Sequence, residues 1–584
     1  MAGIVINGVT IKKPGVYSIA DVSAMVAPNP NANGIIAAIG TCRGGKPFEV
    51  YHFTSPREML ATLKQGELAD CIGLMYSPSG TGGGAYDVLA IRVVGDGYSQ
   101  ASVTLNAGGS QPTLKITALD YGNIGNFIRV GVYDGTSSGK KITIHDYYNN
   151  IPVEVFDNLK DAFSIQYTGT ADTAKLTITR TNNVATEIAC VVEDHPEEGF
   201  VFDLTSNDYR TVGQLVSAIN ALPNYTCALS PYIPAGDLPT SYLDAVADQD
   251  IKTSAYTATA KLGTIIYALE KSKIVRASKA TASATLPPAN TDEVPLSGGS
   301  EGAAPDVNDY NRALALLEGY DCRFIVVTST DSEIQSAVMA HVNSMSSVRH
   351  RKERRAIFGL DPSSGAADYK ARAMALNSHR AILVGPAIKK SINVVLTSLP
   401  GYYLAAITAG TLVGMDVKDN LTFKPVAIEG LTQNFTQAEI DDLISSGVTV
   451  VEYDVRKGYR YVRGVTTHLS DQNLAKIEIN CAEVIDLLTQ DIRTTLEDRY
   501  IGKPMYYGID KAIRDTVISI LERWSKNGRL VGSDTIPAYR NVNVILENGV
   551  AIVSFEASPV IPLNYIVVEE TFSPAYGWTS AVSI

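Results

Sequence analysis

The last part of the chain, residues 541–570, constrains the fold most, because it combines a defined turn with alternating apolar side chains. Asn548-Gly549 predicts a two-residue hairpin turn, since a type I′ turn needs positive φ at both central positions. If the turn closes there, Glu547 pairs with Val550 and the side chains divide between the two faces of the pleat. One face carries Val542, Val544, Leu546, Ala551, Val553 and Phe555, and the other carries Asn541, Asn543, Ile552 and Ser554.

After the hairpin, Pro559 and Pro562 interrupt the strand pattern, because proline cannot donate a hydrogen bond to a ladder. Residues 565–568 then predict one more short strand. Three short strands with free edges are a marginal unit and an open template for a further strand.

The opening residues 1–20 are also apolar and strand-like, and they predict an extended arm. Asn7-Gly8 leaves a small local hairpin open as the alternative. An isolated two-stranded hairpin is scarcely stable in water, so an arm this apolar needs a partner sheet. Both ends of the chain therefore raise one question: whether they pair within one molecule or between molecules.

Four markers along the chain resemble those of one protein family and follow that family's order. The terminal hairpin, the proline break and the last strand resemble the C-terminus of contractile tail sheath proteins of bacteriophages and related injection machines. Residues 13–17 (KPGVY) resemble the PGVY element that follows the family's N-terminal arm. Residues 296–302 (LSGGSEG) resemble its GG-[ST]-[DE]-G loop, and residues 524–532 resemble its W-x-x-G-x-L-x-G helix end, with one extra residue. Residues 399–426 depart from the family pattern, because Phe423 replaces a tryptophan and the APAN tail is missing.

The order of periodic segments predicts an α/β and α+β multidomain protein, whose α/β core is built from N- and C-terminal parts and carries an inserted all-β domain. The expected regions are 1–20, an extended arm; 21–98, the first part of the α/β core; 99–230, an inserted β-sandwich or barrel-like domain; 231–305, a connecting segment with a flexible loop; 306–425, an α/β core with a parallel sheet; and 426–584, a C-terminal α+β domain that ends in the hairpin and the last strand.

Individual elements follow from two periodicities, of 2 for strands and 3.6 for helices. In the inserted domain we expect strands over 114–119, 127–133, 141–145, 174–180, 188–192 and 200–204, and then a helix over 211–220. From residue 306 we expect strands over 324–328, 356–360 and 381–384 and helices over 307–317, 332–346 and 366–377. In the C-terminal domain we expect a helix over 438–445, a strand pair over 448–453 and 459–466, a helix capped by Asn480 with Glu483 at N3, and a helix over 509–527. Residues 280–305 predict a mobile loop, because they are rich in Ala, Thr, Pro, Ser and Gly.

Candidate chemistry is sparse. Asp361 follows a predicted parallel strand, where α/β enzymes place active sites, but a role in capping the next helix is the favoured interpretation. The glycine-rich residues 80–84 lack a P-loop lysine and favour a mobile loop. The basic residues 349–355 fit a solvated helix end as well as they fit an acidic neighbour. We assign no catalytic, metal-binding or cofactor-binding residue.

Composition limits the compartment and the partners. The net charge of −12 argues against nucleic acid as a direct partner. Six scattered cysteines indicate buried thiols of a protein made in a reducing cytoplasm. We expect no secretory signal and no membrane insertion, because the longest apolar run, residues 402–415, is too short to span a bilayer.

The resemblance implies a subunit that polymerises helically around a tail tube, in which both termini add strands to neighbouring subunits. The residues expected to take part in strand exchange are Ile4, Val5, Ile6, Val9, Ile11, Val16, Tyr17, Val553, Phe555, Tyr565, Ile566, Val567 and Val568. The residues expected to face the tube are Lys511, Arg514, Glu522 and Lys526. The implied partners are other copies of the chain, the tail tube protein, and the baseplate and tail terminator proteins, in a virion tail assembled in the host cytoplasm.

Three alternatives stay open at this point. The first is the sheath of a headless contractile system, a tailocin. The second is a multidomain hydrolase that uses Asp361 or His379, against which the missing nucleophile motif argues. The third is a surface adhesin built on the β domain, against which the missing secretory signal argues.

Overall fold

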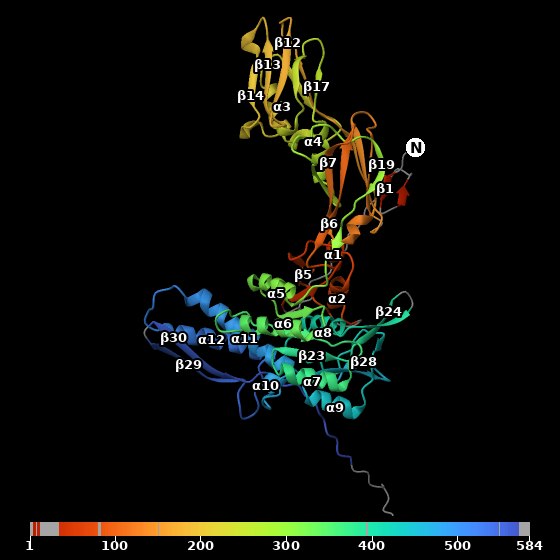
Figure 1. Cartoon of the computed structure of the whole chain (residues 1–584). Coiled ribbons are helices and arrows are strands. Elements are labelled where there is room, and N and C mark those ends of the chain that lie inside the picture. Colours follow the sequence, from red (N-terminus) through yellow and green to blue (C-terminus); the bar gives the residue numbers. More distant parts are fainter. Residues whose placement is uncertain are drawn as a thin grey trace, which may run out of the picture. The chain divides into compact units, whose positions relative to one another are not determined.

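A computed structural model describes the chain over residues 4–6, 9–11, 34–79, 83–149, 151–392, 395–547 and 549–570. The chain forms two compact units, whose elements are labelled in Figure 1. Unit 1 consists of Met1–Ile36, Leu74–Val88 and Gly359–Ile584, and unit 2 consists of Ala37–Gly73 and Leu89–Phe358.

The centre of unit 1 is a set of buried strands covered by helices. Its elements are β23 (Ala381–Gly385), β27 (Val448–Asp454), β28 (Gly458–Tyr461), α7 (Ala366–Leu376), α8 (Tyr402–Gly414) and α9 (Gln437–Ser445). β23 pairs in parallel with β27, which pairs antiparallel with β28. The helix α8 contacts β23 and is buried at every residue, so it has no polar face. Such a helix lacks the 3.6-residue period of a surface helix, and the sequence pattern did not predict it.

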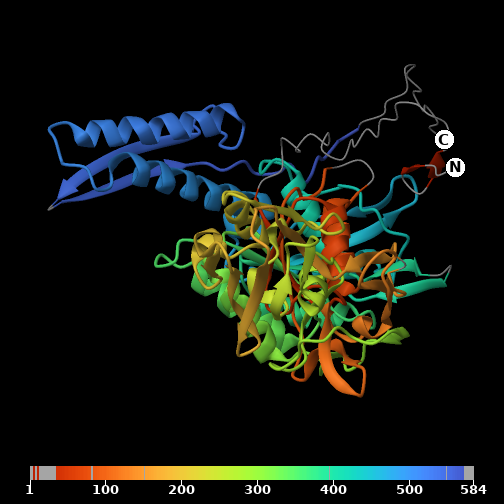
Figure 2. The same cartoon turned by 90° about the horizontal axis from the view of Figure 1, so that it is seen from above.

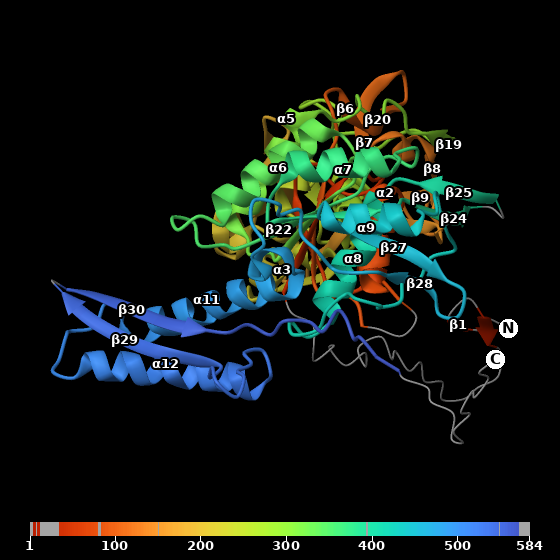
Figure 3. The same ribbon diagram turned by 90° about the horizontal axis from the view of Figure 1, so that it is seen from below.

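A C-terminal module completes unit 1. Its elements are α11 (Ile479–Tyr500), α12 (Ile509–Lys526), β29 (Tyr539–Glu547) and β30 (Val550–Ala557). Figures 2 and 3 show the two helices and the hairpin lying alongside one another, directed away from the strands of unit 1. A cluster of buried side chains from α11 and α12, centred on Val517, Leu521 and Trp524, packs against one face of the hairpin. The helix predicted over 509–527 is confirmed as α12, whose buried face includes Ile513, Val517, Ile520, Leu521 and Trp524.

Smaller elements complete the description of unit 1. They are β1 (Ile4–Ile6), β2 (Val9–Ile11), β24 (Ile388–Ile392), β25 (Val395–Leu399), β26 (Gly430–Leu431) and α10 (Leu474–Ile477). β1 pairs antiparallel with β2, which is the local pairing that the sequence left open as the alternative to an extended arm, and Asn7-Gly8 lies outside the described residues. β24 pairs with both β25 and β26.

Unit 2 contains an α/β region and a β-rich region. The α/β elements are β3 (Ile36–Gly40), β4 (Val50–Phe53), β5 (Val88–Arg92), β21 (Phe324–Val327), β22 (Arg355–Phe358), α1 (Pro56–Leu63), α2 (Glu67–Tyr76), α5 (Val307–Leu316) and α6 (Ser332–Met345). The strand order is β22-β21-β3-β5-β4, and β21 and β22 run parallel, as alternating helices and strands predict. Ser55 caps α1 by accepting from the Glu58 amide, and Pro56 stands at its start, as predicted.

The β-rich region has two cores. The first lies between the sheets β18-β7-β6-β20 and β10-β9-β8-β19, and the second lies around the sheets β15-β11-β17 and β14-β13-β12-β16 with α3. Its strands are β6 (Tyr98–Ala107), β7 (Gln111–Tyr121), β8 (Ile128–Asp134), β9 (Lys140–Asp146), β10 (Glu154–Leu159), β11 (Asp161–Tyr167), β12 (Ala174–Thr181), β13 (Val184–Val192), β14 (Phe200–Asp203), β15 (Tyr225–Leu229), β16 (Val246–Asp250), β17 (Tyr256–Thr259), β18 (Val275–Lys279), β19 (Thr291–Pro295) and β20 (Ser300–Glu301). Its α-helices are α3 (Val212–Asn220) and α4 (Lys261–Glu270).

Two predictions about local structure are wrong. Residues 280–305 were expected to form a loop, but they contain β19 and β20, which pair with β8 and β6. The sequence pattern did not indicate these strands, because β19 and β20 are short and only partly buried and so lack a clear alternation of apolar residues. Asn480 does not cap α11: it lies inside the helix and is buried, while Glu478 occupies the N-cap position.

Candidate assembly surfaces

The hairpin β29–β30 has the predicted turn and most of the predicted register. Val544 pairs with Val553 and Leu546 pairs with Ala551, so the inward face matches the prediction. The register shifts between Arg540 and Asn543, where Asn541 has a φ of 57°. This bulge removes the expected pairing of Val542 with Phe555, although both side chains still pack against the helices.

The outer face of the hairpin exposes an apolar pair among polar residues. Ile545 pairs with Ile552 on this face, and their side chains are 52% and 51% exposed. Among the described residues, β29 and β30 pair only with each other, so each has an outer edge with open backbone donors and acceptors. Open edges of this kind accept a further strand from another chain.

The chain leaves the hairpin through a segment that is anchored at Val560, and further along Asn564 and the hydroxyl of Tyr565 also contact unit 1. Figures 2 and 3 show this segment running back from β30 past α11. The backbone of Val560 donates to the carbonyl of Arg529 at 3.1 Å and accepts from the side chains of Asn480 and Cys481 at 3.3 and 3.1 Å. Burial raises the pKa of the Cys481 thiol to about 12, so this sulfur is a neutral donor.

The four candidate exchange residues beyond this anchor are strongly exposed. The exposed fractions of Tyr565, Ile566, Val567 and Val568 are 76%, 76%, 85% and 70%. Residues 561–570 form no strand with any other segment that the structure describes. The strand predicted over 565–568 therefore does not form within the single chain. Strand addition between copies requires an unpaired apolar segment and an open sheet edge, and this chain carries both.

The candidate residues at the N-terminal end are less fully described. Ile4, Val5, Ile6, Val9 and Ile11 belong to the β1–β2 pair, whose backbone alone is described. Val16 and Tyr17 lie outside the described residues. Val553 and Phe555, by contrast, are held against the helices of the C-terminal module.

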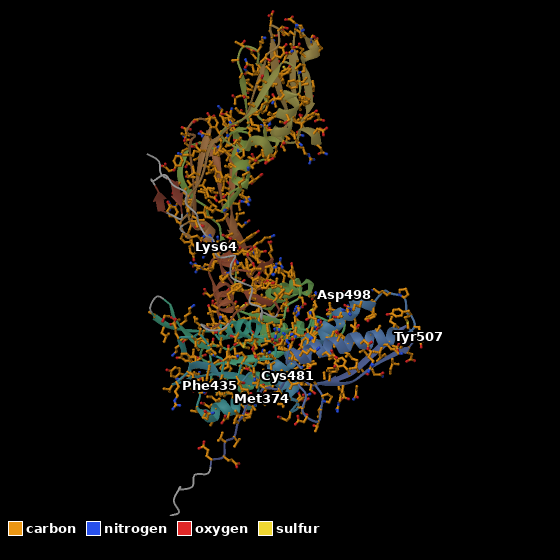
Figure 4. The ribbon with its side chains drawn as sticks, turned by 180° about the vertical axis from the view of Figure 1, so that it is seen from behind. Lys64, Met374, Phe435, Cys481, Asp498 and Tyr507 are labelled. Atoms are coloured by element: carbon orange, nitrogen blue, oxygen red, sulfur yellow. The ribbon has the colours of Figure 1, made fainter. Side chains whose placement is uncertain are left out.

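The candidate tube-facing residues lie on α12 and are exposed, but they are not a set of free cations. Lys526 pairs with Glu522 at 3.8 Å, and Arg514 Nε donates to the carbonyl of Val542 at 3.0 Å. Arg514 therefore reaches the hairpin bulge, which leaves Lys511 as the cation of this group without an ion-pair partner among the described residues. Figure 4 shows Cys481 near the start of the module and Tyr507, which is fully exposed, at its far end.

The residues that suggested enzymatic chemistry have structural roles. Asp361 Oδ1 accepts from the hydroxyl and the amide of Ser363 at 2.7 and 3.0 Å, and these bonds lower the pKa of the Asp361 carboxyl. Asp361 does not cap α7 as expected; Gly365 holds the N-cap position, and its amide donates to Asp368. The His379 ring makes an edge contact with the ring of His468.

The basic residues 349–355 are not a uniformly solvated helix end. Arg354 and Arg355 are buried, and Arg354 donates to the carbonyl of Tyr320 and to His341 Nε2, each at 3.0 Å. Over the part of the chain that is described, no three His, Cys, Asp or Glu residues form a group that could hold a metal ion. No described helix combines the length and the apolar character that crossing a bilayer would require.

Comparison with known proteins decides the family. Residues 303–467 match the phage tail sheath protein central domain. A tail sheath protein of Bacillus phage SP01 is 31% identical over 585 residues, covering 98% of each chain. The chain belongs to the phage tail sheath protein family. A further tail sheath protein, of Staphylococcus phage Twort, is 27% identical over 96% of each chain.

Solved sheath tail proteins share the fold of this family member. That of Desulfitobacterium hafniense matches with a TM-score of 0.55 at 14% identity, over 94% of this chain and 97% of the other. That of Listeria innocua matches with a TM-score of 0.55 at 15% identity, over 90% and 92%. As a tail sheath protein, the chain is a structural subunit of a phage tail sheath and part of the virion tail.

Two polar groups in this sheath protein escaped the sequence analysis. Glu301 lies in the GG-[ST]-[DE]-G loop and pairs with the buried Arg92, so the motif pointed to it without giving its role. Glu478 is fully buried and pairs with Arg463, in no recognised motif. The pairs join residues 209 and 15 positions apart, and periodicity reveals neither.

Proposed function

We propose that this sheath protein polymerises helically around a tail tube and contracts to drive the tube through the host envelope for genome delivery. Subunits are linked by strand exchange. One copy gives its N-terminal residues and a second copy gives its segment from Tyr565 to Val568, and both segments pair with the edges of the hairpin of a third copy. The observation that supports this is that one chain carries both an open-edged hairpin and a strongly exposed apolar tail. Main-chain hydrogen bonds of added strands provide the link.

The polymer follows from the geometry of such a link. A strand given by one subunit and received by another is a heterologous contact, which does not close on itself and so builds a helix. The small β1–β2 pair fits the proposal, because an isolated two-stranded hairpin gives up little stability when it opens to pair elsewhere.

Contraction requires no catalysis in this proposal. Subunits rearrange as rigid bodies about hinges, and the contacts formed in the contracted state supply the free energy. The protein is therefore not an enzyme and uses no cofactor. Its partners are its own copies, the tube, the baseplate and the tail terminator, with neither nucleic acid nor membrane bound directly, and it assembles in the host cytoplasm.

Truncation of each end tests the strand exchange. Removing residues 1–16, or residues 565–584, should leave a folded, soluble protein that forms no cylinders in electron microscopy. Removing residues 571–584 alone is the matched control, because it spares Tyr565 to Val568, and it should still give cylinders. Cylinders from either of the first two truncated chains would disprove the exchange.

A tailocin sheath would use the same contacts, and the phage relatives favour a phage tail. For the tube contact, Lys511 is the residue to test, because Arg514 also holds the hairpin backbone. The change Lys511→Glu should impair assembly on tubes and leave tube-free polymers intact. The control change Lys390→Glu, at an exposed lysine of β24, should leave both kinds of assembly unchanged. Normal assembly on tubes by Lys511→Glu would remove this residue from the proposed interface.

A further inference from the structure

The segment that follows the hairpin alternates between the protein surface and solvent up to one residue. Val560, Pro562 and Asn564 are half-buried, whereas Ile561 and Leu563 are exposed. This period of two indicates an extended chain lying on the domain. From residue 565 to residue 570 every residue is exposed. Asn564 is therefore the last half-buried residue before the exposed tail, and beyond it only the tip of Tyr565 returns to the domain among the described residues, where its hydroxyl accepts from Arg463 Nη1 at 3.5 Å.

The amide of Asn564 is held at both of its polar atoms. Its Nδ2 donates to Glu478 Oε1 at 3.0 Å, and its Oδ1 accepts from the hydroxyl of Thr422 at 3.3 Å. Glu478 is fully buried and also accepts from Arg463, whose Nε lies 3.0 Å away. A buried carboxylate is costly unless it is paired and hydrogen-bonded, so each donor at this site matters.

The carboxylate is only partly satisfied by these contacts. Glu478 Oε2 is buried without a hydrogen-bond partner in the part of the chain that is described. Loss of the Asn564 amide would leave the charge with Arg463 as its remaining side-chain donor. The tail therefore completes the polar environment of a buried charge, which a surface segment without a positional role would not need to do.

The next anchor toward the hairpin is Val560, whose carbonyl accepts from Asn480 and Cys481. If Asn564 were released, the four residues 561–564 would join the free tail. An extended chain rises about 3.3 Å per residue, so the tail would gain about 13 Å of reach. Longer reach lowers the effective concentration of the tail at a neighbouring hairpin and loosens the spacing of linked subunits.

We propose that Asn564, held by Glu478 and Thr422, is a positioning residue that fixes where the C-terminal exchange strand leaves its own subunit. This clamp sets the length and the starting direction of the link between two copies of the chain. The inference rests on the proposed strand exchange, and it adds the residue that makes the exchange geometry uniform along the polymer.

The clamp can be tested first on the unpolymerised chain. A nitroxide spin label on Ile566→Cys reports the motion of the tail two residues beyond Asn564, and the native cysteines are all buried. Adding Asn564→Ala should shorten the rotational correlation time of the label at least twofold. Thr422→Val should have an intermediate effect and Thr422→Ser none, because serine keeps the hydroxyl. Glu569→Gln, an exposed change further along the tail, is the control.

The second measurement is the polymer. Asn564→Ala should raise the critical concentration for cylinder formation about tenfold, and electron microscopy should show a wider spread of helical pitch. Unchanged label mobility or unchanged polymers in Asn564→Ala would overturn the clamp. If the wild-type chain forms no polymer, the proposed function fails instead, and the label measurement still decides whether Asn564 holds the tail.

Discussion

The two units each contain a buried pair of arginine and glutamate, but the buried partner differs. In unit 2 the Arg92 side chain is fully buried and Glu301 is 37% exposed, with Arg92 Nη2 and Glu301 Oε2 2.7 Å apart. In unit 1 the Glu478 side chain is fully buried and Arg463 is 20% exposed. The same chemistry thus desolvates a cation in one place and an anion in the other.

The surroundings of the pairs explain their separate roles. Arg92 ends β5 and also donates to the carbonyls of Gly45 and Tyr121 at 2.8 and 3.0 Å. Glu301 lies in β20, where the chain returns from the β-rich region, and its Oε1 accepts from the amide of Asn123 at 3.2 Å. This pair joins the strands that enter and leave the β-rich region, so both partners belong to segments fixed at both ends.

The pair in unit 1 binds a segment with a free end. Asn564 reaches Glu478 from a tail whose residues 565–570 are all exposed. The Arg92–Glu301 pair therefore holds two strands of the fold together. The Arg463–Glu478 pair instead holds Asn564, and so it sets the direction in which the exposed tail leaves the domain.

The largest effect should follow from Glu301→Gln. This change leaves the Arg92 guanidinium buried without its carboxylate, and breaking such a pair costs about 3–5 kcal/mol. We expect about 3 kcal/mol, because the two carbonyls still accept from Arg92. Urea unfolding followed by far-ultraviolet circular dichroism measures it. A loss below about 1 kcal/mol would show that the Arg92 pair is no more than a surface contact.

A smaller effect should follow from Glu478→Gln. Arg463 is partly exposed and can stay hydrated, and glutamine still accepts from Asn564, so we expect a loss of about 1.5 kcal/mol, typical of one hydrogen bond to a charged group. Trp524 reports this unit, and its fluorescence follows the urea unfolding of the C-terminal module. A loss of unfolding free energy equal to that caused by Glu301→Gln would contradict the proposed difference between the two pairs.

The hairpin and α12 were predictable because each depends on neighbours in sequence. Asn548-Gly549 set the turn, and the spacing of Ile513, Val517 and Trp524 set the buried face of the helix. The family itself followed from four short markers. The bulge at Asn541 was not predictable, because a one-residue insertion leaves the local alternation almost unchanged.

The clamp could not be predicted from the sequence. Glu478 and Asn564 are 86 positions apart, and single polar residues carry no period that links them. Arg92 and Glu301 are 209 positions apart, and only the family loop hinted at Glu301. Contacts of this kind depend on the packing of whole elements, which local propensity does not encode.

A second buried guanidinium, that of Arg354, differs from Arg92 because its neighbour is an imidazole. Arg354 Nη1 donates to His341 Nε2 at 3.0 Å, and burial together with Arg354 lowers the pKa of His341 to about 4. The unfolded chain, with an ordinary histidine pKa near 6.5, binds the proton first. Stability should therefore fall as the pH drops from about 6.5 to about 4, and level off below.

Comparing the wild type with His341→Gln isolates this contribution, because glutamine can accept from Arg354 and does not titrate in this range. The difference in free energy of unfolding between the two proteins should change with pH in that window and be constant above pH 7. A difference that stays constant across the whole window would show that His341 titrates normally in the folded protein.

The smallest effect should come from an exposed pair on the hairpin. Arg540 Nε lies 2.7 Å from Glu556 Oε2, and the two side chains are 48% and 54% exposed. Hydrogen bonds from Asn541 and Arg540 lower the pKa of Glu556, so the stabilisation exists above the ordinary glutamate pKa and is lost as the pH falls through the lowered value. Solvent screening reduces it, and salt reduces it further. Glu556→Gln should leave the urea midpoint of the module unchanged at neutral pH. A shift of the urea midpoint as large as that caused by Glu478→Gln would show that burial does not determine how much an ion pair contributes to stability. The contrast between the two buried pairs would then need another explanation.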